Sequence, residues 1–569
     1  MPEKTSNLDR ILIAIAQLNQ TVGDIEGNLA RIVDAATKAH AAGADILLTP
    51  ELSLSSYPPE DLLLRPAFMH HCAAAINRLL VASQQWPQLH VLIGLPTQAV
   101  NPVSDTDADG RDSADGVLRF NSALLICGGN ILGQYNKHEL PNYTVFDEKR
   151  YFTTGSKPLV FNVKGTQFGV NICEDTWFSR APIQARDAGA QVLLVLNASP
   201  YHMGKEGRRL VEMRERIAET GMAIVYAHLV GGQDEFIFDG ASFVMNSKGQ
   251  LTTQMAQFEE AFAVVEFAGR EPVATAVSDP VVGSVSTAPS VEAQVYQALV
   301  LGVRDYITKN GFPSAVLGLS GGIDSALVLA IAVDALGADR VRAVMMPSKY
   351  TADISWIDSR EMINRIGVRY DEISIGPVFD QFLSTLSTEF DGLKADTTEE
   401  NIQARIRGTL LMALSNKFGS IVLTTGNKSE MATGYCTLYG DMAGGFAVIK
   451  DIAKTLVVRL CHYRNTVSPV IPERIITRPP SAELREDQTD QDSLPPYDVL
   501  DGIVQMYMED NRSIDDMLAA GYPEQSVRQV VRLIKINEYK RRQAPIGIRV
   551  THRAFGRDWR YPITSKFKE

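Results

Sequence analysis

The chain contains no long hydrophobic run. Its apolar stretches, such as Val192 to Leu196, are far shorter than the roughly 20 residues that a membrane-spanning helix requires. The opening residues, Met-Pro-Glu-Lys-Thr-Ser-Asn, have none of the features of a signal peptide. We therefore expect a cytoplasmic protein.

Cysteine is scarce, and basic residues are in deficit. The net charge of −12, from 55 Lys and Arg against 67 Asp and Glu, argues against general nucleic-acid binding. A local basic cluster near the C-terminus could still serve an anionic substrate. The cysteines are odd in number and scattered, which excludes a disulfide framework or C-x-x-C metal spacing; they are Cys72, Cys127, Cys173, Cys436 and Cys461.

The length of the chain exceeds what one ordinary hydrophobic core can hold. At roughly 100–200 residues per domain, 569 residues predict two to four domains. The composition, with 45% hydrophobic and 21% charged residues, is that of an ordinary soluble protein. We find no repeat of fixed period.

The most informative stretch is Ala315 to Ala330, with the sequence AVLGLSGGIDSALVLA. A short apolar run predicts a buried strand, Ser320-Gly-Gly a tight turn, and the spacing of apolar residues from Ile323 onward a helix. The turn therefore opens onto a helix N-terminus, where unpaired N–H groups and the helix dipole favour an anion. This pattern predicts a phosphate-binding loop. It lacks the Lys of the P-loop and instead places Asp324 where it could hold a phosphate-bound Mg²⁺.

A lone Gly-Gly pair before a helix is usually only a packing turn. The six residues Ser320-Gly-Gly-Ile-Asp-Ser325 are much more restrictive. They resemble the pyrophosphate loop of enzymes that split ATP into AMP and pyrophosphate while adenylating a substrate, among them NAD, GMP and asparagine synthetases and tRNA-modifying enzymes. The loop alone implies the ATP chemistry and leaves the substrate open.

The first half of the chain alternates strands and helices. We expect a strand at Ile11 to Gln17, a helix from about Ile25 to Ala42 and a strand at Asp45 to Glu51. The stretch from Val100 to Val117, rich in Asp, Ser and Gly, predicts an exposed acidic loop. Further strands are expected at Val91 to Leu95, Ser122 to Cys127, Asn130 to Tyr135, Phe168 to Cys173, Gln191 to Ala198 and Met222 to Val230.

Three residues of this half stand at predicted strand ends, where sheet proteins usually place ligand-facing groups. Cys173 lies where a strand turns sharply, Lys137 follows a strand, and Glu51 ends another. A thiol nucleophile needs a base, and a developing oxyanion needs a cation or N–H donors. The three together suffice for acyl transfer, although singly they are typical of a buried cysteine and two solvated charges.

The motifs around these residues strengthen the prediction. They are Pro50-Glu-Leu-Ser, Tyr135-Asn-Lys-His-Glu-Leu-Pro and Asn171-Ile-Cys-Glu-Asp-Thr-Trp. Together they resemble the nitrilase superfamily of C–N hydrolases over about residues 9 to 268. The resemblance implies an α/β/β/α sandwich and an amide substrate. It also implies Glu51 as general base, Lys137 as support for the tetrahedral intermediate, Cys173 as thioester-forming nucleophile, and glutamine contacts from Tyr143, Ser199 and Lys205.

Between residues 267 and 291 the periodicity lapses into segments rich in Pro, Ser and Gly. We therefore predict a nitrilase-like glutaminase (carbon-nitrogen hydrolase) domain at 1–270, a linker at 271–290 and a second domain at 291–569. The second domain should begin with a helix at Val291 to Lys309, and the alternation of strands and helices after it predicts a doubly wound parallel sheet.

Motifs of the second half point to its substrate. In order they are Glu400-Asn-Ile-Gln-Ala-Arg, Thr424-Thr-Gly-Asn-Lys-Ser-Glu, Tyr439-Gly-Asp, Lys454, Pro479-Pro-Ser-Ala-Glu-Leu and Arg553-Ala-Phe-Gly-Arg-Asp. They resemble NAD synthetase over residues 290 to 569, with its ATP-pyrophosphatase (adenine nucleotide alpha hydrolase-like) fold. With the nitrilase-like half in front, nearly the whole chain resembles the glutamine-dependent NAD synthetase family.

This resemblance implies ATP, deamido-NAD, and glutamine or ammonia as substrates, Mg²⁺ as cofactor, and NAD, AMP, pyrophosphate and glutamate as products of the last step of NAD biosynthesis. Ammonia made by the first half should pass to the second, and we expect a homo-oligomer. The implied site residues are Gly318, Leu319, Ser320, Gly321, Gly322, Ile323, Asp324, Ser325 and Thr425 for ATP; Asn401, Glu430 and Lys540 for deamido-NAD; and Asp324 and Glu430 for Mg²⁺.

Two alternatives stay open. The same loop and amidase could serve a ligase that adenylates another carboxylate, and the first half could be a non-catalytic oligomerisation module. Glu430 carries two assignments, metal and dinucleotide, and the sequence does not rank them.

Overall fold

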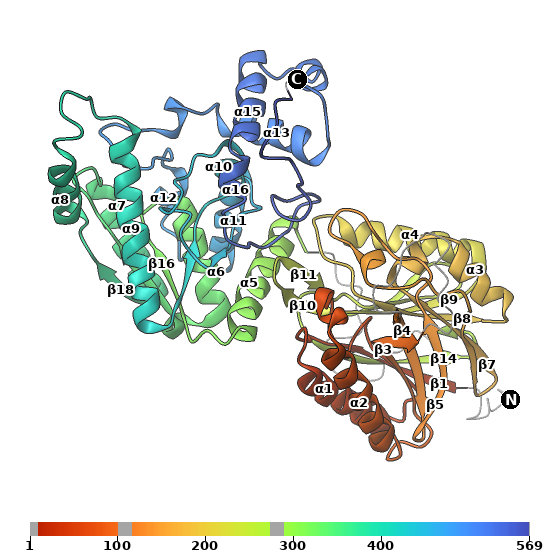
Figure 1. Ribbon diagram of the computed structural model, residues 1–569. Coiled ribbons are helices and arrows are strands. Elements are labelled where there is room, and N and C mark those ends of the chain that lie inside the picture. The colour runs from red at the N-terminus through yellow and green to blue at the C-terminus, as the bar shows by residue number, and fades with distance from the viewer. Residues whose placement is uncertain (1–9, 101–116, 273–288, 568–569) are drawn as a thin grey trace. The chain divides into compact units, whose positions relative to one another are not determined.

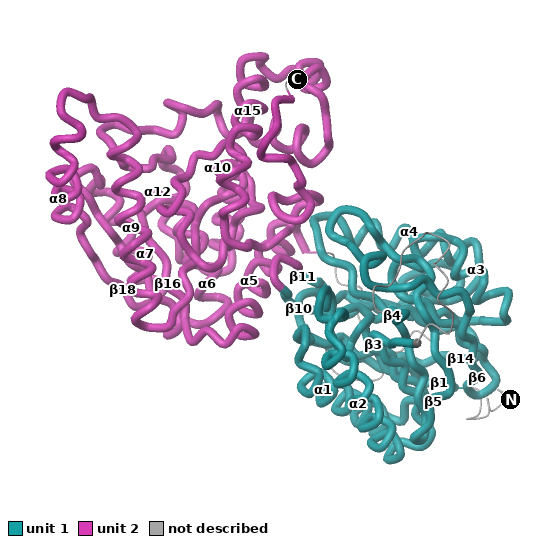
Figure 2. The backbone as a smooth tube through the Cα atoms, in the orientation of Figure 1, with its two compact units in different colours: residues 1–233, 237–288 teal, residues 234–236, 289–569 magenta. Residues whose placement is uncertain are grey.

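The computed structural model describes residues 10–100, 117–272 and 289–567 (Figure 1). The chain divides into two compact units (Figure 2): unit 1 comprises Met1–Gln233 and Ile237–Ala288, and unit 2 comprises Asp234–Phe236 and Pro289–Glu569. The predicted acidic loop and most of the predicted linker lie outside the described residues. Within the described ranges, no helix is both long and apolar enough to cross a membrane.

Unit 1 is built on two mixed β-sheets. The first has seven strands in the order β15-β14-β1-β2-β3-β4-β5, and the second has six in the order β13-β12-β9-β8-β7-β6. A separate pair joins β10 (Val230–Gln233) to β11 (Phe236–Asp239). The strands of the first sheet are β1 (Arg10–Gln17), β2 (Ile46–Leu48), β3 (His90–Val100), β4 (Val117–Cys127), β5 (Asn130–Asn136), β14 (Ala261–Ala268) and β15 (Glu271–Pro272). Those of the second are β6 (Val160–Val163), β7 (Thr166–Ile172), β8 (Val192–Asn197), β9 (Ala223–His228), β12 (Phe243–Met245) and β13 (Leu251–Gln254).

Helices cover the outer faces of the two sheets. Helices α1 (Ile25–Ala41) and α2 (Pro66–Ser83) contact the first sheet, while α3 (Arg180–Asp187) and α4 (Lys205–Thr220) contact the second. Three short 3₁₀ turns join these elements: η1 (Glu60–Leu64), η2 (Glu148–Arg150) and η3 (Cys173–Trp177). Unit 1 is therefore an α/β/β/α sandwich, as expected.

Strand β8 shows why the sequence folds this way. Leu194 belongs to the core between the sheets, with Ile13 and Leu48 from the first sheet. Its neighbours Leu193 and Val195 belong to the core beneath α3 and α4. Alternate side chains of a strand point to opposite faces, so a strand covered on both faces must be apolar throughout. The continuous apolar run is the signature of this doubly covered strand.

Unit 2 contains a five-stranded parallel sheet in the order β18-β17-β16-β19-β20. Its strands are β16 (Ala315–Gly318), β17 (Val341–Met345), β18 (Arg369–Glu372), β19 (Ile421–Thr424) and β20 (Phe446–Ala447). From β16 the chain proceeds outward to one edge through β17 and β18, then returns to place β19 on the other side of β16. Ligands of doubly wound sheets bind in the crevice at such a reversal, outside the carboxyl ends of the strands. The predicted doubly wound fold is confirmed.

Helices α5 to α9 surround this sheet: α5 (Val291–Lys309), α6 (Ile323–Leu336), α7 (Asp353–Ile366), α8 (Gly376–Leu386) and α9 (Thr397–Phe418). The later helices are α10 (Lys428–Thr433), α11 (Lys454–Val467), α12 (Glu473–Thr477), α13 (Tyr497–Val504), α14 (Ile514–Ala519), α15 (Glu524–Ile536) and α16 (Glu538–Arg541). Short turns occur at Ala338–Arg340, Asp490–Asp492 and, as a π-helical turn, Gln505–Glu509. Helices α13 and α15 pack in a second core with Trp559 near the C-terminus.

Several elements differ in length from the expected ones. Helix α5 spans the predicted residues. Strand β19 ends at Thr424, and Asn427 then caps α10, its side chain accepting the N–H of Glu430. Strand β2 ends at Leu48, three residues before Glu51. Residues 271 and 272, which the sequence places at the start of the linker, form β15 and pair with β14.

Candidate active sites

Cys173 of unit 1 follows β7 directly and adopts a left-handed backbone conformation, with φ of +44°. For a residue with a side chain this conformation is uncommon and costs free energy. It turns the chain from strand into η3. The side chain is buried at the carboxyl end of the sheet, 3% exposed. A sharp strand-to-helix turn of this kind presents a nucleophile.

Glu51 and Lys137 lie in contact. The Lys137 Nζ atom is 2.7 Å from Glu51 Oε1, and both side chains are fully buried. The other carboxylate oxygen, Oε2, accepts the backbone N–H of Ala198 at 3.0 Å. Three chain segments far apart in the sequence thus meet at the strand ends, which brings two of the predicted residues together.

Sequence reasoning missed a second acid, Glu148, whose two carboxylate oxygens lie 2.8 and 2.9 Å from Lys137 Nζ. Tyr57 donates to Glu148 Oε1 at 2.9 Å, and Asn121 donates to Glu51 Oε1 at 2.7 Å. Burial raises the pKa of Glu148 to about 7, and the ammonium of Lys137 opposes that rise. Glu148 begins a 3₁₀ turn inside an irregular stretch, where neither spacing nor motif marks it.

The electrostatics of Cys173 favour the thiol over the thiolate. Burial and the Glu51 carboxylate raise the pKa of Cys173 well above its usual range, and the Lys137 ammonium opposes them. A thiol in this state needs a base to become a nucleophile, since the thiolate is the reactive form. Among the charged groups that act on this thiol, the Glu51 carboxylate has the largest effect.

Asp175 holds the turn that carries Cys173. Its carboxylate accepts the N–H groups of Ile172, His138 and Glu139 at 3.0, 2.9 and 2.8 Å, and the hydroxyl of Tyr135 at 2.8 Å. The bonds join the segment after β5, which carries Lys137, to the segment after β7. A fully bonded buried carboxylate of this kind fixes two functional loops relative to each other.

The residues expected to contact glutamine lie on three segments of unit 1. Tyr143 donates to the carboxylate of Glu174, the residue after the nucleophile, at 2.8 Å. The Ser199 hydroxyl accepts from the amide of Asn197 at 3.1 Å. Lys205 begins α4, and its electrostatic neighbours include Cys173 and Glu174. Opposite charges therefore lie beside the predicted nucleophile.

In unit 2 the predicted phosphate loop joins β16 to α6. Gly321 has a φ of +80°, and a Cβ atom there would lie 2.7 Å from the carbonyl oxygen of Ser355. Only glycine fits this position. Within the loop, the Ser325 hydroxyl lies 3.2 Å from the Ser320 N–H and 3.0 Å from the Gly322 carbonyl. Hydrogen bonds among its own residues thus help to fix the shape of the loop.

Asp324, in the first turn of α6, is held by two residues of distant segments. The side chain of Asn427 donates to its Oδ1 at 2.9 Å, and the ammonium of Lys454 pairs with its Oδ2. Burial and the Asp324 carboxylate raise the pKa of Glu430 well above its usual range. The two predicted metal ligands therefore lie close enough to interact.

This donor set fits Mg²⁺, which in nucleotide enzymes is bound through one or two carboxylates together with phosphate oxygens. Within the described ranges, no group of three or more His, Cys, Asp or Glu residues forms a complete metal site. The remaining ligands would have to come from phosphate and water, as expected for an ion that arrives with a nucleotide.

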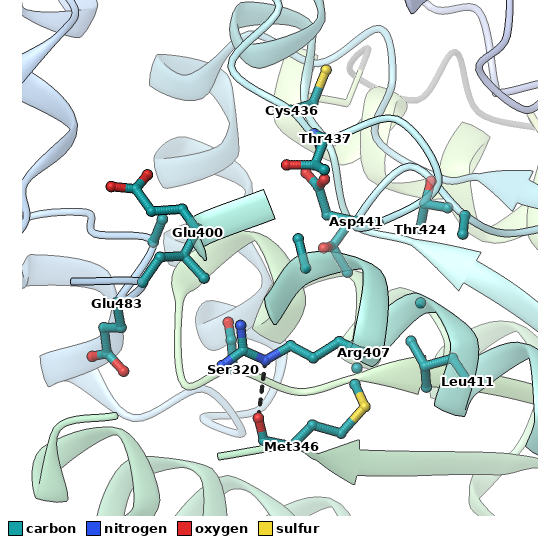
Figure 3. A pocket seen from close by; sticks show the side chains of 18 of the residues that line it. Ser320, Met346, Glu400, Arg407, Leu411, Thr424, Cys436, Thr437, Asp441 and Glu483 are labelled. Carbon is teal, nitrogen blue, oxygen red and sulfur yellow. Dashed lines mark hydrogen bonds between the residues drawn. The ribbon is translucent and has the colours of Figure 1, made fainter. Parts of the chain in front are cut away.

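Next to the loop lies a cavity of about 510 Å³ (Figure 3). It is lined at the strand ends by Gly318, Leu319, Ser320 and Thr425, and farther out by Asn401 and Lys540. Asn401 accepts from the hydroxyl of Thr437 at 2.8 Å, and Lys540 donates to the carbonyls of Gly434 and Cys436 at 2.8 Å each. The other predicted ATP residues, from Gly321 to Ser325, form the loop and the first turn of α6.

One cavity residue received no role from the sequence. Arg407 of α9 donates to the carbonyl of Met346 at 3.0 Å, and its guanidinium lies in the cavity near Ser320 (Figure 3). Burial lowers the pKa of Arg407 to about 10, still far above neutrality, so the cation is retained. Its helical spacing alone did not distinguish it from the exposed Arg405, two residues earlier.

Comparison with known protein families agrees with both units. The family model described as carbon-nitrogen hydrolase matches residues 12–270, and the model described as NAD synthase matches residues 295–544. Fold and sites thus define a fusion of a nitrilase-type hydrolase with a nucleotide-dependent synthase.

Relatives narrow this class. The glutamine-dependent NAD(+) synthetase of Acinetobacter baylyi is 47% identical over 560 residues, covering 98% of each chain, and that of Xylella fastidiosa (strain 9a5c) is 48% identical over 562 residues, covering 98% of this chain and 99% of the relative. The solved structure of the Acinetobacter baumannii enzyme in complex with ADP is 44% identical, has a TM-score of 0.74, and covers 97% of this chain and 98% of that one. The chain belongs to the family of glutamine-dependent NAD(+) synthetases and is an enzyme. The resemblance inferred from the motifs is confirmed.

Proposed function

We propose that unit 1 hydrolyses glutamine at Glu51, Lys137 and Cys173, and that unit 2 uses the released ammonia to convert deamido-NAD to NAD with ATP. The observation that best supports this proposal is the buried contact of 2.7 Å between Lys137 and Glu51, whose charges both act on the thiol of Cys173. Acyl transfer needs a nucleophile, a base and a cation, and these three supply them.

In the first half-reaction, the Glu51 carboxylate takes the thiol proton and Cys173 Sγ attacks the amide carbon of glutamine. Lys137 donates to the developing oxyanion. The C–N bond then breaks, and ammonia leaves with the proton that Glu51 held. Water, deprotonated by Glu51, attacks the thioester carbon, the C–S bond breaks, the Cys173 thiolate takes the proton back from Glu51, and glutamate leaves. The protons balance because Glu51 returns to its ionised form.

Glutamine enters as a zwitterion, so its binding site should offer both charges. The buried carboxylate of Glu174 suits the α-ammonium group, and the ammonium of Lys205 suits the α-carboxylate. Tyr143 supplies a hydroxyl group bonded to Glu174, and Ser199 supplies a second hydroxyl group next to Asn197. These four side chains are our proposal for glutamine recognition.

In the second half-reaction, a carboxylate oxygen of deamido-NAD attacks the α-phosphorus of ATP, and pyrophosphate leaves. Ammonia then attacks the carbonyl carbon of the acyl-adenylate. The C–O bond to AMP breaks, AMP leaves with its electron pair, and NAD is formed. The loop from Gly318 to Ser325 binds the phosphates through backbone N–H groups. Thr425 lines the ATP site, while Asn401 and Lys540 contact the dinucleotide.

Mg²⁺, held by Asp324 and Glu430, would neutralise phosphate charge during the departure of pyrophosphate. Lys454 and Asn427 orient the Asp324 carboxylate toward the loop. Glu430 is closer in role to Asp324 than to the dinucleotide residues, because its carboxylate interacts with that of Asp324. We keep its contact with deamido-NAD as a second, compatible role.

Two alternatives differ in measurable ways. A ligase for another carboxylate would fail to yield NAD from deamido-NAD, ATP and glutamine, which mass detection of the product decides. A non-catalytic unit 1 would release no glutamate from glutamine. The expected cytoplasmic location and homo-oligomeric state stay predictions.

The decisive experiment is Cys173→Ala assayed with each nitrogen source. Glutamine-dependent NAD synthesis should fall to background, because no thioester can form. Ammonia-dependent synthesis should stay within about twofold of wild type, because adenylation belongs to unit 2. Circular dichroism verifies the fold. A variant that retains glutamine-dependent synthesis would show that Cys173 is not the nucleophile.

A further inference from the structure

Lys205 has an unusual environment for a residue that is to bind a carboxylate. Its Nζ lies 4.1 Å from the centroid of the Trp177 indole, within the distance of a cation–π interaction. The guanidinium of Arg208, one turn farther along α4, lies 5.2 Å from the same centroid. One aromatic ring therefore carries two cations, and both belong to the first turn of the same helix.

The position of Lys205 in α4 disfavours its positive charge, so a contact that stabilises the charge is significant. It is the first residue of the helix, after Gly204, which adopts a φ of +78° and provides no side-chain cap. The positive end of a helix dipole disfavours a lysine at that place. Burial and the neighbouring Arg209 guanidinium lower the pKa of Lys205 to about 8. Helix, burial and neighbouring cations all oppose the charge that Lys205 needs in order to bind an anion.

Within the described ranges, no carboxylate forms an ion pair with Lys205. The titratable neighbours that act on it are Cys173 and Glu174 from η3, and Arg208 and Arg209 from α4. Trp177 ends η3, the same five-residue turn that begins with the nucleophile. Its indole face thus supplies the negative potential that an acidic partner supplies elsewhere.

We propose that Trp177 is a positioning residue for glutamine binding: its indole holds the ammonium of Lys205, charged and in place, for the α-carboxylate of the substrate. The inference deepens the proposed function and rests on Lys205 as a glutamine contact. An indole suits this role better than a carboxylate, because a second anion beside Lys205 would neutralise it and repel the substrate. The ring stabilises the cation without competing for it.

A pH titration distinguishes this role from a structural one, because kcat/KM for glutamine reports groups of the free enzyme. The variants are Trp177→Leu, Trp177→Phe, which retains an aromatic face, and Lys205→Met. Phe178→Leu is the matched control, since Phe178 is the next residue and half exposed. Glutamate release is measured with ATP and deamido-NAD saturating, from pH 6 to 9.5.

In the wild type, charged Lys205 prevails below its pKa, so kcat/KM should decline as the pH rises through about 8. Trp177→Leu removes cation–π stabilisation, which should move this midpoint down by about 0.5–1.5 pH units. At pH 8, a fall of one unit would raise KM roughly fivefold relative to wild type. In Trp177→Leu, kcat should change little. Trp177→Phe should keep the midpoint close to that of the wild type, and Phe178→Leu should match the wild type. The ammonium of glutamine itself titrates equally in all variants.

An unchanged midpoint in Trp177→Leu, or a decrease of kcat without a change of KM, would overturn the proposal. Trp177 would then have only a structural role in η3. Lys205→Met tests the premise separately: it should raise KM below about pH 8 and remove the decline centred there, which leaves only the titration of glutamine itself. If Lys205→Met binds glutamine as wild type does, the assigned glutamine contact is wrong and the inference falls with it. If Lys205→Met behaves as expected while Trp177→Leu does not, only the inference falls.

Discussion

Replacing Lys137 by Met tests whether the buried charge cluster of unit 1 serves catalysis or merely the fold. The side chains of Lys137 and Glu51 are fully buried, and that of Glu148 is 5% exposed. Methionine has a similar volume and no charge. It would leave two buried carboxylates facing each other without a cation, and breaking a buried pair in this way costs about 3–5 kcal/mol.

That cost translates into a measurable loss of thermal stability. For a unit of this size about 1 kcal/mol lowers the Tm by roughly 2–4 °C, so Lys137→Met should lower the transition of unit 1 by roughly 6–20 °C. With the lysine gone, the pKa of Glu148 should rise from about 7, because the ammonium that opposes burial is lost. Proton uptake by Glu148 then limits the destabilisation at neutral pH.

The double variant Lys137→Met/Glu148→Gln separates the two roles. The uncharged amide at position 148 removes the repulsion between this side chain and the Glu51 carboxylate, so much of the lost stability should return. The double variant still lacks the Lys137 ammonium, so the proposed donor to the oxyanion remains absent. Glutamine-dependent synthesis should stay at least about 10²-fold below wild type in both variants, as for the removal of an oxyanion donor elsewhere.

The assay compares NAD synthesis from glutamine and from ammonium chloride below the unfolding transition, with Tm measured by calorimetry on the same preparations. Ammonia-dependent synthesis should remain near wild type in both variants. Recovery of glutamine-dependent activity in the double variant, in parallel with stability, would refute a chemical role for Lys137. Retention of activity by the single variant would do the same.

Three further predictions concern unit 2 and its supply of ammonia. Gly321→Ala should abolish synthesis from either nitrogen source, because its Cβ would meet Ser355, whereas Gly367→Ala, with similar φ and no atom within 4 Å, should cost only about 1–2 kcal/mol by chemical denaturation and keep activity; equal activities would contradict the steric argument. Asp324→Ala should stop pyrophosphate release and NAD synthesis with both sources while glutamate release persists, and wild-type pyrophosphate release would reduce Asp324 to a helix N-terminal carboxylate. Unlabelled glutamine supplied with excess ¹⁵N-ammonium should yield mostly unlabelled NAD by mass spectrometry, because ammonia set free in bulk water is diluted and protonated; label in proportion to free ammonium would show that the nitrogen is not passed on directly.

Local signals in the sequence sufficed for the fold class of each unit. The apolar run of β8, the loop at Ser320 and the extent of helix α5 are all short-range patterns, and each corresponds to an element of the structure. Element ends were less predictable: β2 stops at Leu48, the N–H of Thr49 still donates to the neighbouring strand, at Leu92, and Glu51 lies beyond the strand. Strand ends depend on tertiary hydrogen bonds that propensity does not encode.

The residues that sequence reasoning missed share one property: their partners lie far away in the chain. Glu148 contacts Tyr57, which is 91 residues earlier, and Asn121 contacts Glu51 across 70 residues. Arg407 contacts Met346 across 61 residues. Motif spacing reports neighbours within a turn or a loop, so a second carboxylate on Lys137 could be found only after the strand ends had been brought together.

The two sites use the same local device with opposite electrostatic outcomes. In each, a left-handed residue at the end of a parallel strand, Cys173 or Gly321, turns the chain so that the reacting groups lie at the carboxyl edge of the sheet. In unit 1 two carboxylates and one lysine are buried together, and the ammonium forms ion pairs with both acids.

Unit 2 also brings a lysine together with two acids, but the electrostatics of this cluster differ from those in unit 1. Lys454 forms an ion pair with Asp324, while the pKa of Glu430 is raised by burial and by the Asp324 carboxylate and is lowered in part by the Lys454 ammonium. A carboxyl group that resists ionisation beside another carboxylate is stabilised by any cation that displaces its proton. The same three residue types thus form an ion-paired cluster in unit 1, and in unit 2 they would suit a cation bound together with phosphate oxygens, consistent with the proposed hydrolysis at the first site and ATP-dependent transfer at the second.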